Sequence, residues 1–141
     1  LTMRVKPGWF QPTTDSCICH RHKPFDKCCG RFLIDGLHAK TPEQLMRSRY
    51  TAYALGGHGD YLLTTWFSAT SAGLTAESLS KKTLEWIKLD VLKSQQTGDK
   101  ATVEFNAFYH ELDDSKIQVM HEVSVFQRIS GRWFYVGGEV T

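Results

Sequence analysis

Long apolar segments are missing from this sequence of 141 residues. No run approaches the roughly 18 consecutive apolar residues that a membrane-spanning helix needs. The N-terminal region also lacks the uninterrupted apolar segment of about 7–15 residues that is typical of an export signal. Internal repeats are missing too, which excludes a repeat architecture. We therefore expect a protein of the cytoplasm.

A large charge of either sign is also missing, because the formal net charge is only +2. Nothing in this balance requires a polyanionic partner. The hydrophobic content of 41% and the charged content of 23% are those of a soluble globular protein. The chain is long enough for one compact core and too short for two ordinary domains with a linker.

Cysteine is missing everywhere except in one short segment, which holds all four cysteines of the chain: Cys17, Cys19, Cys28 and Cys29. They form a C-x-C pair and a C-C pair with eight residues between them. This spacing allows a turn that directs four sulfurs at one ion. Four thiolates suit tetrahedral zinc, with Zn–S distances of about 2.3 Å. The segment predicts a zinc knuckle.

Other states of these cysteines remain open at this point. A bond between Cys28 and Cys29 is disfavoured, because neighbouring Cα atoms lie about 3.8 Å apart and a relaxed disulfide needs about 4.4–6.8 Å. Nested disulfides would need an oxidising compartment. His20 or His22 can also replace one thiolate, although a histidine beside such a cluster is more often a neighbour than a ligand. We take the four cysteines as the metal ligands.

Three separated blocks of the sequence carry a resemblance to a known family. They are Cys17–Gly30, Met46–Tyr53 and the ending formed by His121–Phe126 and Gly131–Val136. The first block resembles the SEC-C zinc motif of the C-terminal tail of the SecA translocation ATPase. All three together resemble the YchJ-like family of bacterial proteins. The resemblance implies a cone-shaped α+β domain of the nuclear transport factor 2-like (cystatin-like) type, and a knuckle that is an interaction element rather than a catalyst.

The first block departs from that family at Ile18, where proline is usual, and at His20-Arg21-His22, where Gly-Ser-Gly is usual. Glycine accepts a positive φ more readily than histidine does. We therefore expect either that the turn is built differently or that one histidine binds the metal.

The order of secondary structure predicts the same α+β class. Thr41, Pro42 and Gln44 predict the capped start of a helix that Gly56-Gly57 ends. Shorter helices are expected over 60–67, with Asp60 as cap, and over 75–82. Strands are expected over 86–93, 101–110, 116–129 and 132–136, separated by turn residues. Helices followed by a strand meander predict helices packed on one face of a curved antiparallel sheet.

These elements divide the chain into three parts. We expect an irregular N-terminal arm at 1–16, the knuckle at 17–31 and the cone-shaped domain at 32–141. We predict that Cys19→Ser releases the metal and loosens residues 15–32, while the domain stays folded on its own core.

The two central strands are apolar on both faces. Val119, Val123 and Val125 alternate with Met120 and Phe126. One face must meet the helices, so the other is expected to meet a partner, such as a second copy of the chain in a homodimer or the knuckle and arm folded across it.

A second candidate site is the mouth of the cone. Its predicted lining is Arg49, Tyr53, Trp66, Glu122 and Ser124. A carboxylate facing an arginine in an apolar cavity is a plausible anion or acid–base site. The alternative is an ion pair that joins helix to sheet. No catalytic residues are assigned, because the sequence assembles no set of nucleophile and base.

The knuckle is basic, with Arg21, Lys23, Lys27 and Arg31 against Asp26. Together with Phe25, these residues can contact an acidic protein or the phosphates of RNA, including the ribosome. Together with the resemblance to a bacterial family, the sequence thus predicts a zinc-binding adaptor that contacts a protein or ribosomal partner. The alternative is a small-molecule binder or enzyme that uses the cone.

Overall fold

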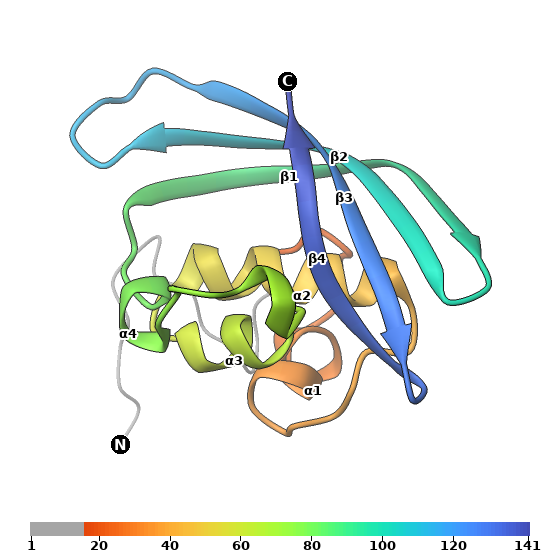
Figure 1. The fold of residues 1–141 in the computed structure, drawn as a ribbon. Coiled ribbons are helices and arrows are strands. Elements are labelled where there is room, and N and C mark those ends of the chain that lie inside the picture. Colours follow the sequence, from red (N-terminus) through yellow and green to blue (C-terminus); the bar gives the residue numbers. More distant parts are fainter. Residues whose placement is uncertain (1–15) are drawn as a thin grey trace.

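The computed structural model describes residues 16–141 (Figure 1). The predicted arm at 1–16 therefore lies outside the described residues, except for Ser16. Among the described residues, no helix is long and apolar enough to cross a membrane.

The second half of the chain folds into one antiparallel sheet of four strands in the order β1-β2-β3-β4. The strands are β1 (Leu84–Thr97), β2 (Lys100–Glu111), β3 (Gln118–Ile129) and β4 (Arg132–Val140). Each strand pairs with the next along the chain, so the sheet is a meander. The sheet is strongly bent, and the helices lie on one side of it (Figure 1). The predicted class, an α+β domain with helices on a curved antiparallel sheet, is confirmed.

The helices precede the sheet. They are α1 (Gly30–Leu33), α2 (Pro42–Leu55), α3 (Gly59–Thr64) and α4 (Ala76–Leu79), with single 3-10 turns at η1 (Phe25–Lys27) and η2 (Ser68–Thr70). Helix α2 is much the longest and packs against the sheet. It also contacts α1 beside the cysteine segment.

The start of α2 follows the predicted chemistry. The Thr41 side chain caps the helix by accepting a hydrogen bond of 3.1 Å from the Gln44 backbone N–H. The Gln44 side chain reaches back, but it accepts from the Lys40 N–H at 2.8 Å rather than from the cap residue itself. Gly56 ends the helix with a φ of 75°, which favours glycine.

Other boundaries differ from the prediction. Helix α3 begins after His58, and the Asp60 side chain instead accepts from the Tyr61 N–H. Strand β1 runs through the polar residues to Thr97, because backbone pairing with β2 continues to the Thr97–Lys100 pair. The prediction relied on apolar alternation, so it missed the four polar strand residues at the exposed end of this hairpin, Ser94 to Thr97.

The core lies between α2 and the inner face of the sheet. On β2, Ala101, Val103, Phe105 and Ala107 are all buried at alternate positions. The outer face of the sheet stays partly apolar and open, with Val119 55% exposed and Val125 40% exposed. A second, smaller cluster of buried residues contains the four cysteines and Phe25.

Candidate metal centre and adjoining cavity

The four cysteine sulfurs meet at one buried point. Their Sγ atoms all lie within 4.8 Å of one another, and the Sγ atoms of Cys19 and Cys28 are 3.5 Å apart. All four thiols are free, and none of these residues is more than 3% exposed. In the described part of the chain, the cysteines form a group whose geometry can hold one metal ion.

The turn between the two cysteine pairs reaches positive φ without glycine. His20 and His22 adopt φ values of 67° and 62°, in the left-handed region that histidine visits less readily than glycine does. The turn is closed by a hydrogen bond of 2.6 Å from the Cys17 N–H to the Lys23 carbonyl. The histidines thus adopt the backbone conformation that glycine would favour, so the altered residues do not require a different turn.

Neither histidine belongs to the group of four sulfurs. The His20 ring lies against β1, with Nε2 3.1 Å from the Ile87 carbonyl oxygen. His22 is exposed. The imidazoles therefore lie beside the cluster, and the set of candidate ligands consists of the four thiols.

Helix α2 fixes the cluster to the domain. The hydroxyl of Thr51, which is fully buried, lies 3.3 Å from Cys29 Sγ and 3.1 Å from the Arg47 carbonyl oxygen. One turn earlier, Arg47 donates through Nη1 to the Cys19 carbonyl at 2.6 Å and through Nε to Glu43 at 3.0 Å. The cysteine segment and the domain therefore share polar contacts as well as apolar packing.

The four thiols are coupled to one another. Hydrogen bonding from Cys19, followed by that from Cys28 and Cys29, holds the pKa of the Cys17 thiol far below its ordinary value, whereas hydrogen bonding with Cys17 raises the pKa values of Cys19 and Cys29. A thiolate is the form that binds metals. Four soft sulfur donors in a closed, buried arrangement fit a thiophilic ion such as zinc and leave no side open to a substrate.

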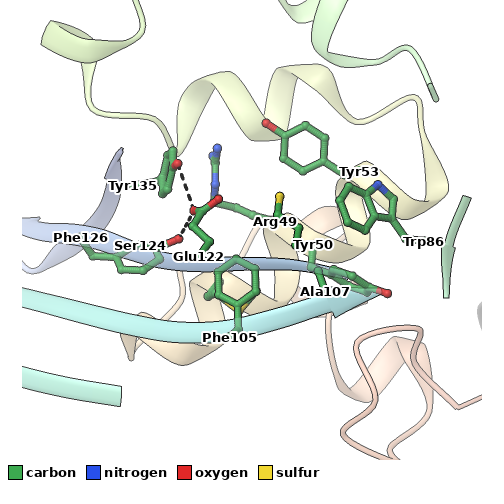
Figure 2. Close-up of a pocket in the computed structure, with 12 residues that line it drawn as sticks. Arg49, Tyr50, Tyr53, Trp86, Phe105, Ala107, Glu122, Ser124, Phe126 and Tyr135 are labelled. Atoms are coloured by element: carbon green, nitrogen blue, oxygen red, sulfur yellow. Dashed lines mark hydrogen bonds between the residues drawn. The ribbon is translucent and has the colours of Figure 1, made fainter. Parts of the chain in front are cut away.

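A cavity of about 240 Å³ lies on the opposite side of α2, between that helix and the inner face of the sheet (Figure 2). Most of its lining is aromatic, comprising Tyr50, Tyr53, Trp86, Phe105, Phe126 and Tyr135. Two charged side chains also line it, Arg49 from α2 and Glu122 from β3. It is slightly smaller than a typical ligand pocket of about 300–1,000 Å³.

Arg49 is only 5% exposed and is held on several sides. Its Nη1 donates to the Leu62 carbonyl and to Thr65 Oγ1, both at 2.7 Å. Its guanidinium carbon lies 4.8 Å from the Trp66 ring centroid and 4.4 Å from that of Tyr135. Burial lowers the pKa of Arg49, but a guanidinium remains charged in a protein.

Glu122 is positioned by its own neighbours on the sheet. Its Oε2 accepts hydrogen bonds from the hydroxyl of Ser124 and, at 3.4 Å, from that of Tyr135 (Figure 2). A side chain at Gly138 on the neighbouring strand would collide with the Glu122 carboxylate. The ion pairs found in the described residues do not include one between Glu122 and Arg49.

The structure places Arg49, Tyr53, Glu122 and Ser124 around this cavity. The fifth predicted residue, Trp66, does not line it. The Trp66 backbone pairs with that of Tyr135, and its ring stacks on the Arg49 guanidinium. Trp66 therefore supports a cavity residue instead of lining the cavity.

Sequence reasoning missed Tyr50 and Tyr135 as lining residues. Tyr50 follows Arg49 directly and fits the helical spacing of apolar core residues, which gave no sign of a cavity. Tyr135 lies in a strand whose inner face could be identified only after its register with β3 was known. The buried Tyr50 hydroxyl has no hydrogen-bond partner among the described residues.

Comparison with known proteins gives consistent matches along the chain. A family model described as "YchJ, middle NTF2-like domain" matches residues 41–138. A UPF0225 protein from Corynebacterium efficiens is 39% identical over 127 residues, which cover 88% of this chain and 92% of that protein.

Two solved structures resemble the whole arrangement. The solution structure of a SEC-C motif containing protein from Rhodopseudomonas palustris has a TM-score of 0.81 and 34% sequence identity, and the match covers 90% of this chain and 99% of that one. The crystal structure of a SEC-C motif containing protein from Psychrobacter arcticus has a TM-score of 0.78 and 25% identity, with coverage of 92% and 85%. Both matches extend beyond the domain that the family model covers.

Proposed function

Because this chain belongs to the UPF0225 family of YchJ-like proteins, we propose that its four cysteines hold one structural zinc ion and that the resulting knuckle docks the protein on an acidic partner. The observation that carries the metal part is the closed group of four buried sulfurs within 4.8 Å of one another. Four thiolates are the usual ligands of a structural zinc site. Reduced thiols also fit the reducing cytoplasm, which we include in the proposal.

The first test is elemental analysis of freshly purified protein, together with thiol titration after unfolding. We expect about one zinc per chain and four titratable thiols, as a site with four thiolate ligands requires. Protein without metal and without free thiols would instead contain disulfides, which would overturn both the zinc and the compartment. Replacement of zinc by Co²⁺ provides an independent measurement, because the visible absorption spectrum of bound Co²⁺ reports thiolate ligation and tetrahedral geometry.

A structural role for the metal is supported by the closed geometry. Catalytic zinc sites typically combine three protein ligands with an open position for water or substrate. Here, four sulfurs converge, and all four cysteines are buried. The ion would therefore stabilise the turn that carries the exposed residues of the knuckle.

The docking part of the proposal is supported by the charge of that turn. Arg21, Lys23 and Lys27 are exposed, and Asp26 is the acidic side chain among them. Arg31 is less available, because its Nε donates to the Cys28 carbonyl at 2.9 Å. A rigid turn with separated positive charges suits an acidic protein surface.

RNA is a weaker fit for the same surface. Single-stranded nucleic acids are usually bound with aromatic side chains on which bases stack. Phe25, which the sequence offered for this contact, is 3% exposed and packs in the cysteine cluster. We therefore favour a protein partner and leave RNA as an outcome of the test.

The partner is tested by crosslinking in cells with and without nuclease treatment. Reversal of charge at Arg21, Lys23 and Lys27 to glutamate should abolish a crosslink that maps to the knuckle. A control that reverses the exposed Lys93, Lys100 and Lys116 changes the charge equally elsewhere and should retain it. A crosslink that survives the first change would contradict the proposal, and one that nuclease removes would identify RNA as the partner.

A further inference from the structure

The cavity between α2 and the sheet contains two opposite charges that do not neutralise each other directly. Arg49 and Glu122 both line it, yet the ion pairs within 4.0 Å among residues 16–141 do not include this pair. Removing a charge from water is costly unless a counter-charge and hydrogen bonds compensate it. The separation therefore leaves each charge without a direct ionic partner.

The protein also satisfies only part of the hydrogen-bonding capacity of each charged group. The two hydrogen bonds of 2.7 Å from the Arg49 guanidinium both go through Nη1, and the Tyr53 hydroxyl, which also faces the cavity, is a further polar neighbour. Both hydrogen bonds to the Glu122 carboxylate go to Oε2. The contacts that fix these two side chains thus leave donor capacity on Arg49 and acceptor capacity on Glu122 for a third group.

The orientation of both groups is set by rigid elements. Arg49 lies against the rings of Trp66 and Tyr135, which contact each other edge to face, and α3 supplies the carbonyl of Leu62. Glu122 lies on the central strand β3, where Ser124 hydrogen-bonds to it. Fixed polar groups in an apolar cavity are the usual means by which a small-molecule site selects the orientation of its ligand.

A further polar group in the lining lacks a partner. The Tyr50 hydroxyl is buried without any hydrogen bond to the described residues, and Tyr50 as a whole is only 6% exposed. Burial raises the pKa values of Tyr50 and Tyr53, so both hydroxyls remain protonated at neutral pH and can donate. Such an unpartnered hydroxyl costs stability, but its oxygen is itself buried, so Tyr50 contributes its ring to the lining and the Tyr53 hydroxyl remains the donor beside Arg49.

The size and lining of the cavity limit what that occupant can be. Its volume of about 240 Å³ exceeds the roughly 150 Å³ that accommodates benzene in an engineered apolar cavity. One ring or a branched aliphatic group with a short polar end therefore fits. Several lining residues, among them Tyr53, Trp86 and Met120, are only half-buried, so the cavity is not sealed from the surface.

We propose that this cavity binds a small zwitterion with an apolar side chain, of the class of the apolar α-amino acids. The ligand's carboxylate meets the free donors of Arg49, its ammonium meets Glu122, and its side chain packs among the aromatic rings. A zwitterion adds no net charge to a cavity that already holds one charge of each sign. This site is independent of the cysteine cluster and adds a ligand to the proposed adaptor role.

Isothermal titration calorimetry of the zinc-replete protein tests this with three matched probes. L-Phenylalanine carries both charges, 3-phenylpropanoate lacks the ammonium, and phenethylamine lacks the carboxylate. We expect L-phenylalanine to bind at least about tenfold more tightly than either analogue, because each lost contact leaves one buried charge without its partner. Binding of one analogue as tightly as the amino acid would overturn the zwitterion, and no saturation by any probe up to about 10 mM would overturn the site.

Two variants locate the binding and separate it from misfolding. Glu122→Gln keeps the shape of the side chain, so L-phenylalanine and 3-phenylpropanoate should then bind within about threefold of each other. Ala107→Leu fills the cavity from β2 and should abolish binding of all three probes. Thermal unfolding of each variant verifies the fold, and retained discrimination in a folded Glu122→Gln variant would contradict the proposed contact.

Discussion

The two sides of helix α2 differ in how completely their polar groups are paired within the protein. On one side, Arg47 and Thr51 contact the cysteine segment, and their polar atoms have partners within the protein. On the other side, Arg49 and Tyr50 line a cavity in which the Arg49 charge is only partly matched and the Tyr50 hydroxyl is unmatched by the described residues. A single helix therefore joins a closed site to an open one.

The difference separates groups that hold the fold together from groups that remain available for a ligand. Buried polar groups that are fully satisfied make a structure rigid, whereas a partly satisfied set is costly and persists at functional sites. The cysteine side thus has the properties of a structural centre. The cavity side has those of a binding site.

The largest expected effect on stability comes from disrupting the cysteine cluster, which is the closed side of α2. Cys19→Ser should abolish zinc binding and lower the free energy of unfolding by about 4 kcal/mol or more, because metal binding is folding free energy in small zinc sites. Zinc content and urea unfolding measure the two effects. The sequence alone predicts loosening of only residues 15–32, but the contacts of Arg47 and Thr51 predict that the loss also reaches α2.

Hydrogen exchange decides between these two outcomes. We expect faster exchange in α2 of the Cys19→Ser variant as well as in the knuckle. The matched control is His20→Asn, which changes a residue beside the cluster and keeps a side chain that tolerates positive φ. The control should keep about one zinc per chain. Its loss would mean that His20 contributes to the site.

A smaller loss of stability is expected when the contact between Thr51 of α2 and the cysteine cluster is removed. Thr51→Val keeps the buried volume but removes the hydroxyl beside Cys29 Sγ. We expect a loss of about 1.5–3 kcal/mol in unfolding free energy, the range for hydrogen bonds to charged groups, together with weaker zinc binding. Thr51→Ser keeps the hydroxyl and should retain the zinc affinity, so equal weakening in both variants would assign the effect to packing instead.

The cysteine cluster could be predicted from the sequence, whereas the cavity could be predicted only in part. The difference is that the cluster depends on local spacing and the cavity on contacts between distant segments. The cysteines lie within 13 residues of one another, so their spacing alone indicates convergence. The cavity requires the register between β3 and β4, and its Arg49 is held by the Leu62 carbonyl and Trp66 through contacts that no local pattern encodes. Trp66 was misplaced because it follows α3 as an extended residue paired with Tyr135, not as part of the predicted helix.

A still smaller effect on stability is expected on the cavity side of α2. Tyr50→Phe removes a buried hydroxyl that has no partner among the described residues, so the free energy of unfolding should stay the same or rise by up to about 1 kcal/mol. Tyr61→Phe is the contrasting control, because the Tyr61 hydroxyl lies 2.6 Å from Ser48 Oγ. Its removal should cost about 1 kcal/mol. Urea unfolding of both variants measures the difference, and a clear loss in Tyr50→Phe would mean that the hydroxyl is satisfied in solution.

The least effect on stability is expected on the outer face of the sheet, which neither site uses. Val119 and Val125 on β3 are 55% and 40% exposed there, and we expect this face to pair with a second copy of the chain. Val119→Lys with Val125→Lys should leave the unfolding free energy of the monomer nearly unchanged but shift sedimentation from dimer to monomer, because each copy would then bury two unpaired charges. Ile34→Lys with Leu37→Lys makes the same exchange at exposed residues before α2 and should leave the dimer intact. A native protein that sediments as a monomer at every concentration would show that this face needs no second copy.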